Sequence, residues 1–469
     1  MQFQLAESEI KTYLKYAKMN LPRHTSYPAA PYWQENFPLN GIKEALGVLE
    51  SQSHALSLYF HIPYCRQLCF YCACTKEIYP EDRQKKNDPR EKLVDGLIQE
   101  MSFYSQHLKS NAVEQIHLGG GTPTFLSAEQ LKRLFEAIRS RFSVRENAEI
   151  AVEIDPRVTT FEHLQTLRAA GCNRVSLGVQ DFSEKVQKAI NRIQPYEMVE
   201  EIVKQARSLS FESINFDLIY GLPFQSLESM ERSLELTLKL SPDRIAFYRL
   251  ALIPELFKWQ KSFGREHLPS EMENIDIFLA ALNTFTQKGY GFIGLDHFAK
   301  KEEWLSEAIQ DKSLRRNFQG MTTGKSLAII GMGPSAVSQV PGYFWQNKKT
   351  SEEWNAALAK EEWTVHKGIK LTSDDKIRQE LIHELYCYGS LNWNELSERV
   401  GLDLQKYFEC ENGALESFES EGILTLNSEG FALSAVLGRL LVRLVAARFD
   451  RYLEEEKAAT QSTRFSQLG

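Results

Sequence analysis

Apolar and polar residues follow one another in segments that fit first a strand and then a helix. Short apolar runs rich in β-branched and aromatic residues predict six strands, at residues 56–62, 113–118, 149–154, 174–179, 212–220 and 244–252. Longer stretches with apolar residues three and four apart predict amphipathic helices between them, at 91–108, 128–142, 160–170, 198–208 and 227–240. Six successive β-α units predict a parallel sheet covered by helices, because parallel strands need crossover connections.

The residues that follow each predicted strand separate two possible architectures, a doubly wound open sheet and a β/α barrel. Polar residues or glycines come directly after the strands, at 64–74, 119–124, 155–157, 180–181 and 221–223. In a barrel these strand ends converge on one mouth, where such enzymes place their chemistry. The pattern therefore favours an α/β fold with an incomplete (β/α)6 barrel.

The remaining segments predict three regions. Residues 1–50 are expected to form an N-terminal helical strap or substrate cover, 51–355 the catalytic partial barrel, and 356–469 a mainly helical C-terminal domain. Within the barrel region, strand-like pieces at 291–295 and 327–330 are expected to extend or close the sheet.

Helices followed by the hairpin sequence GILTLNSEGFAL and a long terminal helix give the C-terminal domain a winged-helix-like pattern. Residues 373–430 contain 13 acidic and 4 basic side chains, which favours a lid or docking domain over a DNA-binding one.

Composition excludes several classes of protein. With 43% hydrophobic and 25% charged residues, the 469-residue chain has the composition of an ordinary globular protein. The 55 Lys and Arg residues against 62 Asp and Glu give a net charge of −7, so nucleic acid is not expected as a partner. The first twenty residues offer no apolar signal segment, and the apolar stretch at 433–447 is too short to span a bilayer. We therefore expect a cytoplasmic protein without a membrane span.

Four of the seven cysteines lie within ten residues, in the order Cys65, Cys69, Cys72 and Cys74. Three closely spaced thiolates on one loop can hold three irons of a [4Fe–4S] cluster and leave the fourth iron open to a substrate or cofactor. Zinc held by three of these cysteines and His61 is the structural alternative. Cys74 as a fourth ligand would close the open iron, and its role stays unassigned.

The other three cysteines stand alone in the sequence. They lack ligand-type neighbours at metal spacing and are expected to be ordinary small buried residues. They are Cys172, Cys387 and Cys410.

A glycine-rich GGGTP segment after the second strand, together with the three-cysteine loop after the first, resembles the radical S-adenosylmethionine (SAM) enzymes. More narrowly, the chain resembles the family of oxygen-independent coproporphyrinogen III oxidases, also called coproporphyrinogen dehydrogenases. The resemblance rests on six motifs in order, which are YFHIPYC with CFYCAC, HLGGGTPT, EIDP, GVQDF, NFDLIYGLP and RNFQG.

The resemblance implies which residues hold the cofactors. Cys65, Cys69 and Cys72 would be the ligands of one [4Fe–4S] cluster per chain, whose open iron binds SAM. The positions that contact this first SAM in the family match Tyr59, Gly120, Glu153 and Val337 here.

A second SAM is also implied by the resemblance. The positions matching its contacts are Tyr71, Gly121, Thr122, Gln180, Arg192, Asp217 and Ala251. No further catalytic residue is expected, because radical bond cleavage needs no general base.

The implied activity is the oxidative decarboxylation of two propionates of coproporphyrinogen III to vinyl groups, which gives protoporphyrinogen IX in anaerobic haem (heme) and porphyrin biosynthesis. An electron donor such as flavodoxin or ferredoxin and a monomeric state are expected. The alternative is a haem-binding protein of the haem-chaperone type, from the same superfamily.

An acidic chain needs local cations to hold an anionic substrate. The N-terminal segment PRHTSYPAAPYW offers Arg23, His24, Tyr27, Tyr32 and Trp33, either as a cover over the barrel mouth or as a strap packed on the barrel.

The segment GMGPSA at 331–336 fits the glycine pattern of a dinucleotide site. The residues after it do not continue as a helix, so we expect no NAD site there. Its place next to a strand end favours a loop that borders the adenosine of SAM.

Overall fold

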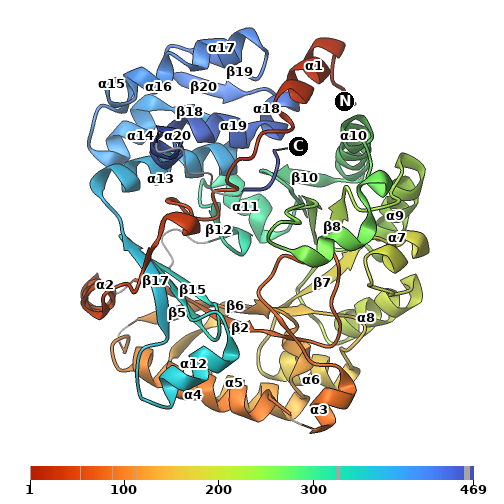
Figure 1. The fold of residues 1–469 in the computed structure, drawn as a ribbon, viewed down its shortest axis with the longest axis vertical. Coiled ribbons are helices and arrows are strands. Elements are labelled where there is room, and N and C mark those ends of the chain that lie inside the picture. Colours follow the sequence, from red (N-terminus) through yellow and green to blue (C-terminus); the bar gives the residue numbers. More distant parts are fainter. Residues whose placement is uncertain are drawn as a thin grey trace.

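The central element is a sheet of 13 strands that contains all six predicted strands as parallel neighbours in sequence order (Figure 1). The structure, a computed structural model, describes residues 2–52, 54–86, 88–109, 111–323, 328–458 and 465–468. The six strands are β2 (Leu56–Ile62), β5 (Ala112–Gly120), β6 (Ser143–Ile154), β7 (Arg174–Gln180), β8 (Ser213–Tyr220) and β9 (Arg244–Arg249).

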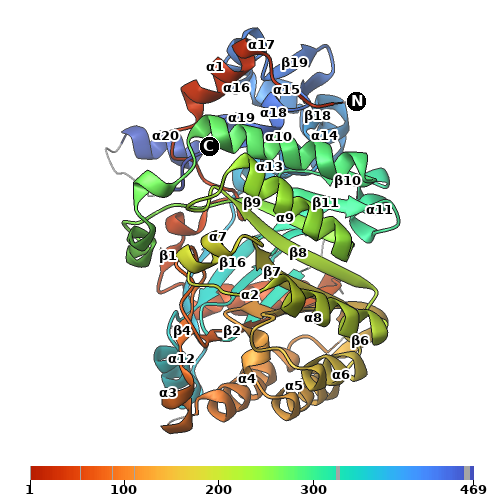
Figure 2. The same ribbon diagram turned by 90° about the vertical axis from the view of Figure 1, so that its right-hand side faces the viewer.

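The predicted helices lie on the outer side of this curved sheet (Figure 2). They are α4 (Arg90–Ser105), α5 (Ala128–Arg141), α6 (Phe161–Ala169), α8 (Tyr196–Ser208) and α9 (Leu227–Leu240). Capping boxes at Ser127, Thr160 and Ser226 begin three of them, since each hydroxyl accepts from a backbone N–H that the first turn leaves unpaired. Apolar side chains from strands and helices share one continuous core. The prediction of an incomplete (β/α)6 barrel is confirmed.

Additional strands extend the sheet on both sides. On one side β14 (Ala328–Met332) pairs in parallel with β2, followed outward by β15 (Val337–Val340), β16 (Tyr343–Asn347), β17 (Val365–Lys370) and β1 (Gln34–Glu35). On the other, β11 (His297–Lys300) and β10 (Tyr290–Ile293) continue from β9. The pieces expected at 291–295 and 327–330 therefore extend the sheet, with Leu327 outside the described residues. The sheet includes strands from both sides of the expected boundaries at 50 and 355, and the domain division stays a prediction.

Residues after β17 form a separate helical unit with its own core. A small sheet in the order β18-β20-β19 packs with helices in the arrangement expected of a winged-helix-like module. Its elements are α13 (Ser373–Tyr388), β18 (Ser390–Asn392), α14 (Trp393–Val400), α15 (Leu404–Tyr407), α16 (Glu409–Asn412), α17 (Leu415–Ser420), β19 (Leu424–Asn427) and β20 (Gly430–Leu433).

The prediction of one long terminal helix is wrong. The segment is broken into α18 (Leu437–Leu440), α19 (Val442–Ala446), η5 (Ala447–Phe449) and α20 (Arg451–Ala458). The break before α20 has a tertiary cause: Asp450 adopts an extended conformation, and its carboxylate pairs with the buried His24 ring at 2.9 Å.

The N-terminal segment packs between the barrel and the helical unit, where α1 (Glu7–Tyr16) joins the core of that unit. His24 is buried against Asp450 and the Tyr386 hydroxyl, Tyr32 stacks on Tyr452, and Trp33 stacks on Phe344. Most of its aromatic groups are therefore used in packing, as the strap interpretation expected. The segment also contains η1 (Ala30–Tyr32) and α2 (Leu39–Gln52).

The described residues also form other helices and strands. They are β3 (Tyr64–Cys65), β4 (Glu77–Ile78), α3 (Glu81–Lys86), η2 (Pro123–Phe125), α7 (Glu184–Ala189), η3 (Lys258–Phe263), η4 (Arg265–His267), α10 (Glu271–Gln287), α11 (Trp304–Gln310), the hairpin β12 (Arg315–Asn317) with β13 (Gly320–Thr322), and α12 (Ser351–Leu358). None of the described helices is both long and apolar enough to cross a membrane.

A buried carboxylate fixes the GMGPSA loop against the barrel. Glu100 of α4 accepts hydrogen bonds from the Gly333 N–H and the Trp354 indole at one oxygen, and from Asn347 and Thr364 at the other. Strand β15 follows the loop, so the prediction that no helix continues from it is confirmed. Burial raises the pKa of Glu100 to about 7, although the four donors oppose the shift.

We expect Glu100→Gln to be less stable than the wild type, by a margin that narrows as the pH rises from 5.5 to 8. Because the pKa in the folded state lies above that of the unfolded chain, the stability from protonated Glu100 is complete below about pH 4.5 and is lost as the pH rises through about 7. The margin should change on the order of 2–3 kcal/mol. Denaturation midpoints of the two proteins across this range measure it, and a margin independent of pH would contradict the assignment.

Candidate functional site

The cysteines lie on the segment that leaves the end of β2, here called the cysteine loop (residues 63–76). Strands β3 and β4 pair in parallel and frame this loop. Inside it, the Cys72 N–H donates to the Cys69 carbonyl at 3.1 Å, and the Phe70 N–H donates to the Ile190 carbonyl at 2.9 Å. The loop is therefore held both by its own turn and by the segment after α7.

The loop borders a cavity of about 250 Å³ at the carboxyl ends of the parallel strands, here called the cysteine-loop cavity. Most of the predicted site residues line it. They are Cys65, Cys69, Tyr71, Cys72, Gly120, Gly121, Thr122, Glu153, Gln180, Arg192 and Asp217. Residues far apart in the sequence thus meet at one barrel mouth.

Two glycines bring the backbone at the end of β5 close to the cysteine loop. Gly120 has a φ of +109°, and a Cβ there would lie 2.5 Å from the His61 ring. At Gly121, a Cβ would lie 2.7 Å from the backbone of Pro63, and its N–H donates to the Ile62 carbonyl at 2.8 Å. Only glycine fits these two positions, so the turn can pack directly against the cysteine loop and still line its cavity.

Glu153 is fixed at the end of β6 by two donors. Its carboxylate accepts from the Gly120 N–H at 3.1 Å and lies 3.1 Å from His117. Burial alone would raise the pKa of Glu153, but His117 and the Gly120 N–H together hold it below its usual value. Glu153 therefore presents a negative charge that can accept from a ribose hydroxyl or an ammonium group.

Two positively charged side chains lie next to the Cys69 thiol. The Arg157 and Arg192 guanidinium groups lie 3.5 and 3.7 Å from its sulfur, and both bind the Asp155 carboxylate. Burial would raise the pKa of Asp155, but the two arginines hold it well below its usual value. Donors directed at a thiolate stabilise its charge, as expected beside an iron–sulfur centre.

Asp217 of β8 has a different charge environment from that of Glu153 and Asp155. It accepts from Asn215 at 2.9 Å and from the Ser176 hydroxyl at 3.3 Å. Burial, and then the nearby Glu153 charge, raise the pKa of Asp217 to about 6. The cavity therefore holds carboxylates with separated pKa values at the ends of neighbouring strands.

The loop after β9 closes over the outside of the cysteine loop. The Gln260 amide donates to the carbonyls of Tyr71 and Ala251 at 3.1 and 2.9 Å, and the Trp259 indole donates to the Cys72 carbonyl at 2.9 Å. Tyr71 also packs against an apolar cluster from α7 and β8. These contacts fix the part of the loop that carries the third cysteine.

Three predicted site residues do not line the cysteine-loop cavity. Tyr59 lies behind it, with its hydroxyl 2.9 Å from His61 and its ring stacked on His117. Ala251 reaches it only through Gln260, and Val337 packs in the cluster of Trp33 and Phe344. Their assignment to the cofactors stays a prediction.

Lys76, Arg157 and Tyr248 line the cavity but were not predicted as site residues. Lys76 donates to the Cys72 and Cys74 carbonyls, both at 3.2 Å. A signal for Arg157 was available, since it follows the end of β6 at the same barrel mouth as Asp155. Tyr248 lies near the end of β9, where no polar residue was considered.

The remaining four cysteines differ in their burial and in their neighbours. Cys74 lines the cavity, and its hydrogen bond lowers the pKa of Cys72 to about 6. Cys172 and Cys387 are buried as expected, but Cys410 is exposed, so that prediction is wrong. Cys387 also has a ligand-type neighbour, since the His383 ring lies 3.5 Å from its sulfur one helical turn away.

The zinc alternative needs a free ring nitrogen on His61. One of its nitrogens binds the Tyr59 hydroxyl at 2.9 Å and the other binds the Thr75 carbonyl at 3.0 Å. Within the described residues, no three His, Cys, Asp or Glu side chains come together as ligands of a single metal ion.

The residues present fit an iron–sulfur cluster with SAM. Three thiols line one cavity, and the buried Nη1 of Arg157 has no hydrogen-bond partner among the described residues. Soft thiolates with nearby donors suit iron and sulfide, and the cavity beside them leaves room for a bound ligand.

This arrangement on a partial barrel defines the class of radical SAM enzymes, and residues 59–237 match the Radical SAM superfamily. The oxygen-independent coproporphyrinogen III oxidase of Pseudomonas aeruginosa is 38% identical over 92% of this chain and 93% of its own length. That of Helicobacter pylori strain J99 is 39% identical over 95% and 97%. The solved structure of coproporphyrinogen III oxidase from Escherichia coli, described as a radical SAM enzyme, superposes with a TM-score of 0.89 at 34% identity, over 96% of this chain and all of that one.

The chain belongs to the oxygen-independent coproporphyrinogen III oxidase family. It is therefore an enzyme, and its superfamily uses a [4Fe–4S] cluster and SAM.

We expect Asp155→Asn to raise the reduction potential of the cluster by tens of millivolts. The substitution removes the charge that balances Arg157 and Arg192, and the uncompensated guanidinium groups favour the more negative reduced cluster. Anaerobic potentiometry monitored by electron paramagnetic resonance measures the shift. Glu184→Gln, on the exposed surface of α7, is the matched control and should leave the potential unchanged. Equal potentials in D155N and wild type would contradict the charge balance.

Proposed function

We propose that this protein oxidatively decarboxylates two propionates of coproporphyrinogen III to vinyl groups and so forms protoporphyrinogen IX. Each event removes one hydrogen atom and one electron from a propionate and releases carbon dioxide. The observation that carries the proposal is the convergence of Cys65, Cys69 and Cys72 on one cavity with the Gly120 turn and Glu153. The relatives named above are named for this activity, and they align with more than nine-tenths of this chain.

Cys65, Cys69 and Cys72 would hold the single cluster, and Cys74 would stay outside the ligand set. Cys74 is exposed, whereas Thr122 donates to Cys65 and two arginines donate to Cys69. When bound, the cluster and SAM supply the one-electron hydrogen abstraction that an unactivated propionate carbon needs. Exclusion of water from the buried cavity protects that chemistry from side reactions.

The predicted SAM-binding residues form two groups, one for each of two SAM molecules. Gly120 and Glu153, with Tyr59 behind them, and Val337 would bind the molecule at the cluster. A second SAM molecule would contact the other predicted residues, of which Gln180, Arg192 and Asp217 line the cavity from β7, β8 and the turn after α7. Electron delivery by flavodoxin or ferredoxin, a monomeric state and a cytoplasmic location complete the proposal. The haem-chaperone alternative is not favoured, because the nearly full-length relatives reported above are named oxidases.

The product assay tests the reaction directly. Anaerobically reconstituted protein with a reductant, SAM and coproporphyrinogen III should form protoporphyrinogen IX and 5′-deoxyadenosine. Replacement of Cys65, Cys69 or Cys72 by Ala should abolish both the product and the visible absorption of the cluster, because each removes one thiolate. Cys74→Ala should retain the absorption. Loss of the cluster in that variant would overturn the ligand set, and stable haem binding without decarboxylation would favour the alternative.

Asp217→Asn should lower turnover by roughly ten-fold or more and leave the absorption of the cluster unchanged, because it removes a carboxylate acceptor on the β8 wall of the cavity. Turnover number and iron content measured on the same preparation separate the two effects. Asp276→Asn on α10 is a control remote from the cavity. Turnover of D217N equal to that of the wild type would count against a second SAM at this wall.

A further inference from the structure

The proposed substrate poses a charge problem that the cysteine-loop cavity does not solve. Coproporphyrinogen III carries four propionates, and the two that do not react stay ionised throughout. The chain has a net charge of −7, so these carboxylates need local cations. The N-terminal segment does not supply them, since Arg23 donates to the Arg249 carbonyl and burial lowers the pKa of His24.

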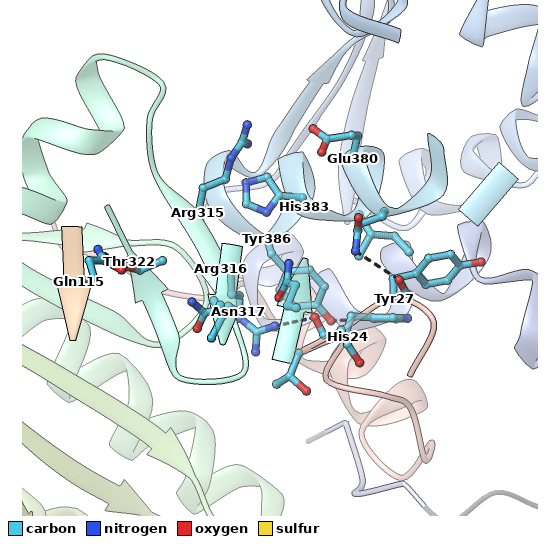
Figure 3. A pocket seen from close by; sticks show the side chains of 16 residues that line it. His24, Tyr27, Gln115, Arg315, Arg316, Asn317, Thr322, Glu380, His383 and Tyr386 are labelled. Carbon is cyan, nitrogen blue, oxygen red and sulfur yellow. Dashed lines mark hydrogen bonds between the residues drawn. The ribbon is translucent and has the colours of Figure 1, made fainter. Parts of the chain in front are cut away.

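A separate cavity of about 160 Å³ lies between the N-terminal segment, the β12–β13 hairpin and α13, and is called the arginine cavity here (Figure 3). Its volume is that of about five water molecules at roughly 30 Å³ each, which suits one propionate arm. Arg315 and Arg316 of β12 both line it, with Gln115 and Thr322 on one side and His24 and Tyr386 on the other.

The two guanidinium groups are not neutralised. Within the described part of the chain neither forms an ion pair with a carboxylate, and the buried Nη1 of Arg315 has no hydrogen-bond partner. Arg316 is held in place by its own contacts, since its Nη1 donates to the Arg23 and His24 carbonyls and its guanidinium stacks over Tyr386 at 4.7 Å. Figure 3 shows the two side chains leaving β12 in opposite directions, as successive strand residues do. Arg315 therefore offers the unpaired guanidinium that a carboxylate can bind, and Arg316 adds positive charge to the same cavity.

The other charged groups of the arginine cavity leave its net charge positive. Glu380 is the acidic side chain that lines it, and His383 is held neutral because burial, and then Arg315, lower its pKa to about 3. Asp296, the other carboxylate that acts on Arg316, is paired with His297 at 2.6 Å. Two permanent cations therefore face one carboxylate.

Shared walls connect the arginine cavity to the cysteine loop. Gln115 and Thr322 also line a central cavity of about 90 Å³ inside the barrel. That central cavity shares Glu153, Ser176, Asp217 and Tyr248 with the cysteine-loop cavity. A carboxylate held in the arginine cavity would thus belong to the same internal surface as the reacting groups.

We propose that Arg315, supported by the positive charge of Arg316 in the same cavity, forms a carboxylate-binding subsite that holds a non-reacting propionate of the tetrapyrrole substrate. The inference rests on the proposed function. The contact is made equally before and during the reaction, so it contributes to substrate binding and not to the chemical step.

Arg315→Gln tests the subsite in the anaerobic, cluster-loaded enzyme. Loss of one charge-assisted hydrogen bond should raise the KM for coproporphyrinogen III about ten-fold with little change in kcat. The same variant should bind coproporphyrin III, the oxidised porphyrin with the same four propionates, about ten-fold more weakly in a fluorescence titration. Arg315→Lys should recover part of the affinity because it keeps the charge. Arg232→Gln, on the exposed face of α9, is the matched control and should behave as the wild type.

A second variant approaches the subsite from the opposite wall. Gln379→Glu places a carboxylate in the arginine cavity, where it should pair with the arginines and repel the propionate, and so also raise KM. This variant decides the matter if Arg315→Gln does not fold.

The outcomes separate the two proposals. Wild-type KM and coproporphyrin III affinity in both R315Q and Q379E would overturn the subsite, even with full product formation. A wild-type protein that binds coproporphyrin III through Arg315 but forms no protoporphyrinogen IX would overturn the proposed function and support the subsite.

Discussion

The parallel pairing of the six strands β2, β5, β6, β7, β8 and β9 is the constraint on which the site depends. In a parallel sheet every strand ends at the same edge, so residues more than a hundred positions apart meet without long connecting loops. Cys65, Gly120, Glu153 and Asp217 reach one cavity because each lies in the second half of a different strand or shortly after it. The outer helices and the continuous core under them fix the spacing of these strand ends.

Charge compensation is the second principle of the site, because Asp155 and its two arginines lie where water screens them little. Asp155 is shared by two arginines that also face Cys69, and Glu153 is shared by His117 and a backbone N–H. Each buried charge therefore has partners on neighbouring strands or turns, which favours a single arrangement. Arg315 and Arg316 differ from these groups, since neither forms an ion pair in the described part of the chain and Arg315 has a buried Nη1 without a hydrogen-bond partner.

The sequence predicted those parts of the fold and site that depend on local patterns. The strand at residues 56–62 was placed to the residue, because its apolar run ends at a proline. The cysteine loop and the glycine turn were found since their residue types are specific to their chemistry. Features that depend on distant contacts were missed. Arg157 gains its role from Cys69, the terminal helix breaks where Asp450 binds His24, and the exposure of Cys410 depends on how α16 packs.

The junction between the two ends of the chain has a consequence for biosynthesis. Arg443 is buried and donates to the carbonyls of Leu21 and Pro22 as well as to those of Ser466 and Gln467. His24, a few residues from Leu21, needs Asp450. On the ribosome the N-terminal segment emerges before the barrel strands, but it reaches its final contacts only after Arg443 and Asp450 have been translated. The wall of the arginine cavity that residues 24–27 form is therefore completed only after residue 450 has been translated.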